Sequence, residues 1–214
     1  MYNARCKMSR AEARIRGVGR PRAFEPRQVV EAAGDLFWER GYEMTSIGEL
    51  EKKTGLDRSS LYHAFGNKHA LFEAAMECYV EVNLEARLAG MREGEAGLET
   101  VVGFFTGMAE TFRSDPRAGR GCLMVNSVAE LGSRDTHVLR AAIGYRDKFR
   151  DAFATALRRA AGRGEVDGNT TRVRAEFLTA TTMGLFLTAR IDLADAAETC
   201  AGTAAEVSAW RQGA

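Results

Sequence analysis

Apolar residues recur along the chain with the spacing of amphipathic helices. In the first clear stretch the apolar positions fall on one helical face; they are Val29, Val30, Ala33, Leu36 and Phe37. Pro26 suits the first turn of this helix, and Gly41 suits its C-terminal end. The pattern therefore predicts a helix that begins near Pro26 and ends near Gly41.

A short helix is predicted after this one. Thr45 or Ser46 supplies its N-terminal cap, and Glu49 stands three residues after Ser46, which is the spacing of a capping box. Gly55 ends the helix, because glycine readily adopts the left-handed conformation of a C-terminal cap.

A second short helix is predicted over Arg58–Phe65, with Asp57 as its N-cap. Leu61 and Phe65 form its inner face. A longer helix then runs from Lys68 to Met91, with its apolar residues on one side.

The remainder of the chain also has helical periodicity. Further helices are predicted near residues 98–113, 119–132, 136–162, 170–191 and 194–211. The last proline is Pro116, so the strongest helix breaker is absent from the second half of the chain. We expect an all-α fold with three parts: a flexible arm (1–24), a small helical module (25–72) and a larger helical body (73–214).

Charge is distributed unevenly along the chain. Residues 1–27 carry eight basic and two acidic residues, although the whole chain has a formal net charge of only +1. A basic end on a mildly acidic body is typical of a protein that meets a polyanion. The alternative is a solvated tail without a partner.

Several protein classes are disfavoured by composition. No secretory signal is evident, and the most apolar stretch, Phe177–Ile191, is too short and too polar to span a bilayer. We therefore expect a cytoplasmic protein with no membrane partner. The four cysteines are widely spaced, without a CxxC pair, which disfavours a disulfide framework and a zinc site; they are Cys6, Cys78, Cys122 and Cys200.

Catalytic chemistry has little support in the sequence. The three histidines are scattered, and no set of nucleophile, base and orienting group is visible; they are His63, His69 and His137. We expect no catalytic residues, no metal ligands and no cofactor. An enzyme that uses Cys122 or a histidine brought together in space stays open as a rival.

The two short helices form a helix-turn-helix pattern with a surface suited to a DNA groove. Ser59, Ser60, Tyr62 and His63 lie away from the apolar face, where they can reach phosphates or base edges. The N-terminus of this second helix presents N–H groups that favour a phosphate.

Residues 26–72 resemble the DNA-binding domain of the TetR (tetracycline-repressor-like) family. The most specific part is the run Leu-Tyr-His-x-Phe-Gly-x-Lys, residues 61–68, after the Thr54-Gly55 turn. The resemblance implies a three-helix DNA-binding domain, a helical ligand-binding domain and a homodimer. It also implies DNA contacts by position, at Ser46, Arg58, Ser59, Ser60, Tyr62, His63 and Lys68. Asp57 departs from the residue that many members carry, and we expect a helix cap there rather than a DNA contact.

The arginine arm has two interpretations. Arg20 and Arg22 flank Pro21 in a segment that resembles the arms preceding many TetR-like domains, where arginines enter the minor groove. Alternatively, the arm supplies only nonspecific attraction to DNA.

The body is expected to bury a pocket for a small-molecule effector, whose identity the sequence does not indicate. Candidate lining residues are Phe105, Met108, Cys122, Asn126 and Thr181. The segment 120–126 with Glu130 and Leu131 resembles a TetR subgroup, some members of which sense electrophiles or oxidants through cysteine. Exposed, Cys122 would have a lowered pKa; buried, it would be an inert apolar residue.

The last two predicted helices are expected to form the dimer interface. Their small alanine-rich turns permit close packing into a four-helix bundle across a two-fold axis. The larger apolar residues assigned to this interface are Phe177, Leu178, Leu185 and Leu193.

The sequence predicts a homodimeric, ligand-responsive transcriptional regulator, a repressor, that binds a palindromic double-stranded DNA operator and is released by a small-molecule or thiol-reactive effector. The principal rival is an architectural protein that binds DNA without operator choice.

Overall fold

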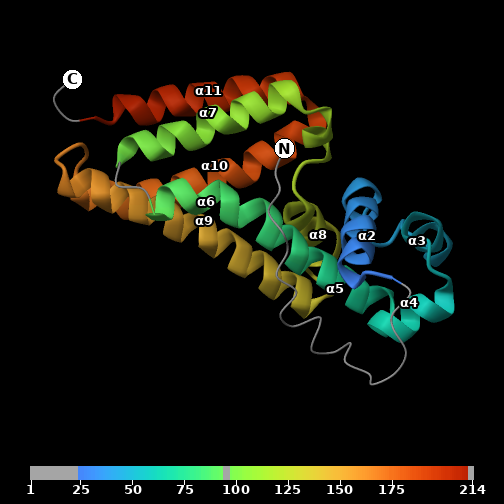
Figure 1. The fold of residues 1–214 in the computed structure, drawn as a ribbon. Helices are drawn as coiled ribbons and strands as arrows, with labels where there is room; N and C mark the ends of the chain where they lie inside the picture. Colours follow the sequence, from blue (N-terminus) through green and yellow to red (C-terminus); the bar gives the residue numbers. More distant parts are fainter. Residues whose placement is uncertain (1–23, 94–96, 212–214) are drawn as a thin grey trace. The chain divides into compact units, whose positions relative to one another are not determined.

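The computed structural model describes residues 24–93 and 97–211, and these residues form helices joined by short turns (Figure 1). The α-helices are α2 (Pro26–Arg40), α3 (Ile47–Thr54), α4 (Arg58–Phe65), α5 (Lys68–Tyr79), α6 (Glu85–Glu93), α7 (Leu98–Ser114), α8 (Leu123–Leu131), α9 (Thr136–Gly162), α10 (Thr171–Ile191) and α11 (Leu193–Ala209). Within the described ranges there is no β-strand, so the predicted all-α class is confirmed. The predicted arm, residues 1–24, lies outside the described residues except for Phe24.

The chain divides into two compact units. The first contains the described residues of Met1–Ala86 together with Asn126–Ala141, and the second contains the described residues of Arg87–Val125 and Ala142–Ala214. A segment from the C-terminal half of the sequence thus folds with the N-terminal helices.

In the first unit, α2 packs against α5 and α3, and α4 packs against α3 and α5. Pro26 begins α2 as predicted, and Phe37 on its buried face contacts Phe72 of α5 with ring centroids 5.0 Å apart. Burial of such apolar side chains holds the short helices together, because helices of eight residues are marginal in isolation.

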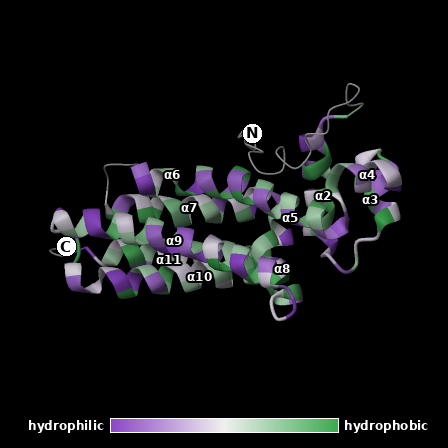
Figure 2. Ribbon diagram, turned by 90° about the horizontal axis from the view of Figure 1, so that it is seen from below, coloured by the Kyte–Doolittle hydropathy of each residue, from purple (hydrophilic) through white to green (hydrophobic). Residues whose placement is uncertain are grey.

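In the second unit, α11 packs along α7 and α10 (Figure 1). The helices carry both hydrophobic and hydrophilic bands, as expected of amphipathic helices (Figure 2). Aromatic side chains fill the core: Phe105 of α7 stacks on Phe153 of α9 at 5.8 Å, and Phe149 meets Phe186 of α10 at 6.2 Å.

Two departures from the predicted helices have local causes. The helix predicted over Lys68–Met91 stays helical to Glu93, but it contains a π-helical turn at Val80–Leu84, η1, which accommodates an extra residue. The helix predicted over 119–132 begins only at Leu123, because Gly121 has φ 69° and ψ −133° and ends a 3-10 turn, η2 (Pro116–Arg120). The second 3-10 turn is η3 (Gly168–Thr170).

No helix in the described part of the chain is both long enough and apolar enough to cross a membrane.

Candidate nucleic-acid interface

Three side-chain caps fix the helices that follow α2. Ser46 and Glu49 form the predicted capping box of α3, in which each side chain accepts the backbone N–H of the other residue. Asp57 Oδ1 accepts the Ser60 N–H at 2.7 Å and begins α4, while Asn67 Oδ1 accepts the Ala70 N–H at 2.9 Å and begins α5. Each cap satisfies a donor that a helix N-terminus leaves free.

The turn between α3 and α4 is short and glycine-dependent. Gly55 adopts φ 72° and ψ 9°, the left-handed conformation that most side chains avoid, and its N–H donates to the Glu51 carbonyl. This turn brings α4 back against α3, which is the arrangement of a helix-turn-helix.

The N-terminus of α4 is occupied by carboxylates. Glu51 Oε1 accepts the Arg58 N–H at 2.7 Å, in addition to the Asp57 cap on Ser60. The backbone N–H of Ser60, followed by its side chain, lowers the pKa of Asp57 below its usual value. The free N–H groups that the sequence predicted for a phosphate are therefore partly taken within the chain.

The outer face of α4 presents the polar side chains that the sequence predicted. Arg58, Ser59 and His63 are exposed, and Ser60 and Tyr62 are half-buried. Leu61 is buried, as expected of the inner face, whereas Phe65 is only half-buried.

Arg58 and Tyr62 contact each other on the first turns of α4. The Arg58 guanidinium carbon lies 5.3 Å from the centroid of the Tyr62 ring, within the range of a cation–π contact. Both side chains are thereby oriented before any ligand arrives, which lowers the entropy cost of placing them against a base or a phosphate.

Ser46 and Lys68 lie on either side of these helices in sequence. The Ser46 hydroxyl is exposed and donates to Glu49 Oε2 at 2.8 Å. Lys68 Nζ lies 4.3 Å from the ring centroid of Tyr42. Partial burial lowers the pKa of Lys68, although nearby carboxylates, that of Glu43 first, act in the opposite direction.

The predicted minor-groove arginines, Arg20 and Arg22, lie outside the described residues.

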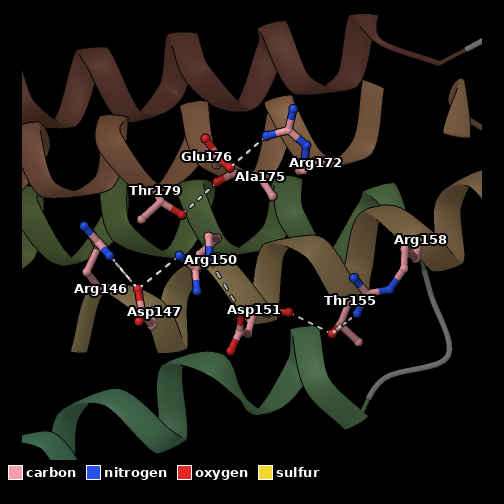
Figure 3. Close-up of polar contacts among 10 residues, drawn as sticks. All are labelled: Arg146, Asp147, Arg150, Asp151, Thr155, Arg158, Arg172, Ala175, Glu176 and Thr179. Carbon is pink, nitrogen blue, oxygen red and sulfur yellow. Dashed lines mark hydrogen bonds and ion pairs between the residues drawn. The ribbon is translucent and has the colours of Figure 1, made fainter. Parts of the chain in front are cut away.

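The predicted effector-site residues occupy different environments. Phe105, Met108 and Cys122 are buried, whereas Asn126 and Thr181 are half-buried. Near Thr181, the two buried threonines of α10, Thr179 and Thr182, are satisfied within their own helix. The contact from Thr179 Oγ1 to the Ala175 carbonyl, 2.7 Å, is drawn in Figure 3.

Cys122 lies in the core of the second unit. Its side chain is fully buried, and its Sγ donates to Tyr145 Oη at 3.2 Å. Of the two environments considered from the sequence, exposed or buried, Cys122 therefore has the buried one. The other described cysteines, Cys78 and Cys200, are also buried, and burial raises the pKa of Cys200 to about 12. Among the described residues, no cluster of three or more His, Cys, Asp or Glu side chains is arranged to hold a metal ion.

The outer face of α10 is apolar. Large side chains stand exposed along one stripe, with exposed Ala180 and Gly184 between them: Val173 (59 % exposed), Phe177 (54 %), Leu187 (56 %) and Ile191 (81 %). Leu178 and Leu185, which the sequence assigned to an interface, instead point into the protomer core, where both are buried. The assignment of those two residues was wrong, because they lie on the opposite face of α10 from the stripe.

Sequence reasoning missed residues that act across the helices. Glu51, two residues after the capping-box glutamate, contacts the next helix. Lys52 and Lys53 stand exposed on the last turn of α3, where positive charge favours a phosphate partner. The sequence itself contains the signal for the adjacent lysines, whereas the contact of Glu51 with the Arg58 N–H across the α3–α4 turn depends on the fold.

Comparison with known proteins shows the family to which these helices belong. Residues 29–75 match the family model of bacterial regulatory proteins of the tetR family, and residues 97–205 match that of the tetracyclin repressor-like C-terminal domain. The chain is 30 % identical over 158 residues to the uncharacterized HTH-type transcriptional regulator YezE of Bacillus subtilis, covering 74 % of this chain and 81 % of YezE.

Two further similarities extend the comparison. The HTH-type transcriptional repressor ComR of Escherichia coli is 32 % identical over 114 residues, 53 % of this chain and 54 % of ComR. Among solved structures, a cysteine mutant of the TetR family transcriptional regulator CifR, complexed with a 26-base-pair operator DNA, superimposes with a TM-score of 0.75. It is 27 % identical, and the match covers 90 % of this chain and all of that one.

Proposed function

The chain belongs to the TetR family of bacterial transcriptional regulators, and from this membership we propose that it is a ligand-responsive repressor that binds a palindromic operator as a homodimer. The observation that carries the proposal is the capped α3–α4 pair with its exposed polar face, in a chain similar to a regulator solved on operator DNA. As a protein that binds operator DNA in a bacterial cell, it is proposed to act in the cytoplasm.

In the proposed complex, α4 enters the major groove. Arg58, Tyr62 and His63 face the base edges, while Ser46 and Lys68 contact phosphates on either side. Residues 25–72 supply the DNA-binding domain, and residues 73–214 supply the effector-binding and dimerising body. Arg20 and Arg22 add contacts in the minor groove.

The proposed dimer buries the stripe on α10. Four large apolar side chains exposed along one helical face make a patch that monomeric proteins rarely leave in water. Exposed small residues on α11, among them Ala201 and Ala205, let a partner helix approach closely. Packing α10 and α11 against their two-fold mates gives a four-helix bundle.

Polar residues border the stripe on α10. Arg172 Nη1 and Glu176 Oε1 pair at 3.2 Å along the helix (Figure 3). They precede the stripe residues Val173 and Phe177 directly in the sequence. A polar rim around an apolar centre is the usual composition of a protein interface.

The effector is proposed to bind in the body and to favour a dimer geometry that does not fit the operator. Such a shift requires the effector to have different affinities for the two geometries. Phe105, Met108, Asn126 and Thr181 are the proposed contacts. Cys122 is the proposed target of a thiol-reactive effector, and its burial means that such a compound acts only after the core opens.

The test of the proposal is an unbiased selection from a pool of randomised double-stranded DNA. We expect one consensus with two-fold symmetry, bound by two protomers, with half-sites about one helical turn or more apart. Recovery of DNA without a consensus, bound with equal affinity whatever its sequence, would instead support architectural binding.

A further inference from the structure

The turn between α2 and α3 is held by a side chain from far along the sequence. Glu130 of α8 accepts two backbone N–H groups of this turn: that of Tyr42 at Oε2, 3.0 Å, and that of Glu43 at Oε1, 2.7 Å. Glu130 belongs to the segment Asn126–Ala141, which folds in the same compact unit as the DNA-binding helices. One carboxylate thus accepts two donors in a bidentate, charge-assisted contact.

The backbone of Gly41 favours a glycine at this turn, and the Glu130 carboxylate lies close beside it. Gly41 has φ 87°, and a Cβ at this position would lie 2.9 Å from Glu130 Oε2. Arg134 adds a second connection, because its Nη2 donates to the Glu130 carbonyl at 3.1 Å and lies 3.6 Å from Glu43 Oε1. The turn is therefore fixed to the end of α8 by both main-chain and side-chain contacts.

The ring of Tyr42 connects this turn to Lys68. The ring packs on Phe72 with centroids 4.8 Å apart, and Lys68 Nζ lies 4.3 Å from the ring centroid. A shift of the turn moves the ring, and a shift of the ring moves the surface over which the ammonium group is placed.

We propose that Glu130 is a positioning residue for operator binding: its carboxylate fixes the 41–43 turn and, through the Tyr42 ring, places Lys68 against a DNA phosphate. The inference rests on the proposed function, in which Lys68 contacts the backbone. In this proposal, the C-terminal end of α8 holds in place the turn that positions the DNA-binding surface.

The negative charge of Glu130 lets the proposal be distinguished from a purely electrostatic effect on DNA affinity. Removing a negative charge near a polyanion should, by electrostatics alone, strengthen binding. A positioning role predicts the opposite, since Lys68 in the variant is no longer held against its phosphate. In Glu130→Gln one carboxylate oxygen is replaced by an NH₂ group that cannot accept an N–H; in Glu130→Ala both acceptors are removed.

The experiment measures the affinity for the selected operator as a function of salt. The slope of log affinity against log salt falls by about 0.9 for each phosphate that the protein no longer neutralises, which corresponds to roughly eightfold weaker binding per protomer at about 0.1 M salt. Partial unfolding lowers the active fraction without altering this slope, so the slope separates positioning from stability. Glu99→Gln, an exposed glutamate of α7, is the matched control for charge.

We expect Lys68→Ala and Glu130→Ala to reduce the slope equally, the double variant to reduce it no further than either, and Glu99→Gln to match the wild type. Hydrogen exchange should show the Tyr42 and Glu43 amides losing protection in Glu130→Ala. A wild-type slope in Glu130→Ala, or tighter binding by Glu130→Gln, would overturn the proposal. An unchanged slope in Lys68→Ala would also overturn the positioning role of Glu130, but it would leave specific operator binding untouched. Only the failure to select any operator sequence would refute the proposed function itself.

Discussion

Replacing Gly121 by alanine should be strongly destabilising. The residue adopts φ 69° and ψ −133°, a combination that side chains avoid, and strain of this kind costs about 1–3 kcal/mol. A Cβ would also lie 2.6 Å from the carbonyl oxygen of Phe186 and 2.7 Å from Cγ of Arg190. Because the first of these atoms is backbone, α10 or the η2 turn must move, at a further cost of about 1–3 kcal/mol.

The two effects together amount to about 2–6 kcal/mol, a large part of the stability of an ordinary domain. Gly144 provides the matched control: it lies in α9 and is exposed, and an added Cβ would meet nothing within 4 Å beyond its chain neighbours and the backbone of its own helix. Gly144→Ala should therefore stabilise the protein by about 0.5–1 kcal/mol.

The assay is chemical denaturation of the wild type and both variants at one protomer concentration, because the stability of a dimer depends on concentration. Wild-type or higher stability in Gly121→Ala would refute the reasoning from backbone conformation and close approach. A decrease of similar size in the free energy of unfolding of both variants would show that the effect does not arise from the surroundings of Gly121.

Four further predictions concern individual side chains. Tyr62→Ala should weaken operator binding by about 1–3 kcal/mol and relax base preference in each half-site; retention of both in anisotropy titrations would remove Tyr62 from the base contacts. Phe177→Arg should yield monomers in sedimentation at concentrations where the wild type is dimeric, and an unchanged dimer would place the interface elsewhere. The Ser60 N–H lowers the pKa of Asp57, so the stabilising contribution of the ionised Asp57 cap is complete above about pH 4 and is lost as the pH falls further. Asp57→Asn should therefore lose less stability in acid than the wild type. The same loss of stability with falling pH in both proteins, measured by thermal melting, would contradict this. Cys122→Ser should abolish release from the operator by thiol-reactive compounds, and release that persists would leave Cys122 as a core residue.

The elements near the DNA-binding surface could be predicted because their signals are local. The Ser46–Glu49 capping box, the Gly55 turn and the Asp57 cap each depend on residues within four positions of one another. Hydrophobic periodicity likewise located the long helices, since burial on one face imposes the spacing of 3.6 residues.

Contacts between distant residues could not be predicted in this way. Glu130 reaches Tyr42 across 88 positions, and no local pattern indicates that partnership. The burial of Cys122 against Tyr145 and the inward direction of Leu178 depend on how helices pack. The π turn at Val80–Leu84 also escaped prediction, because apolar spacing alone does not reveal one extra residue in a helix.

Recognition of a specific operator by α4 is the central claim. Its most direct test is fluorescence anisotropy of the purified protein on DNA fragments flanking its own gene, with scrambled fragments of equal length, over a range of salt concentrations. We expect tight binding to one fragment that persists at salt concentrations where the scrambled controls no longer bind. Equal, steeply salt-sensitive binding to every fragment, together with no consensus in the unbiased selection, would contradict the claim.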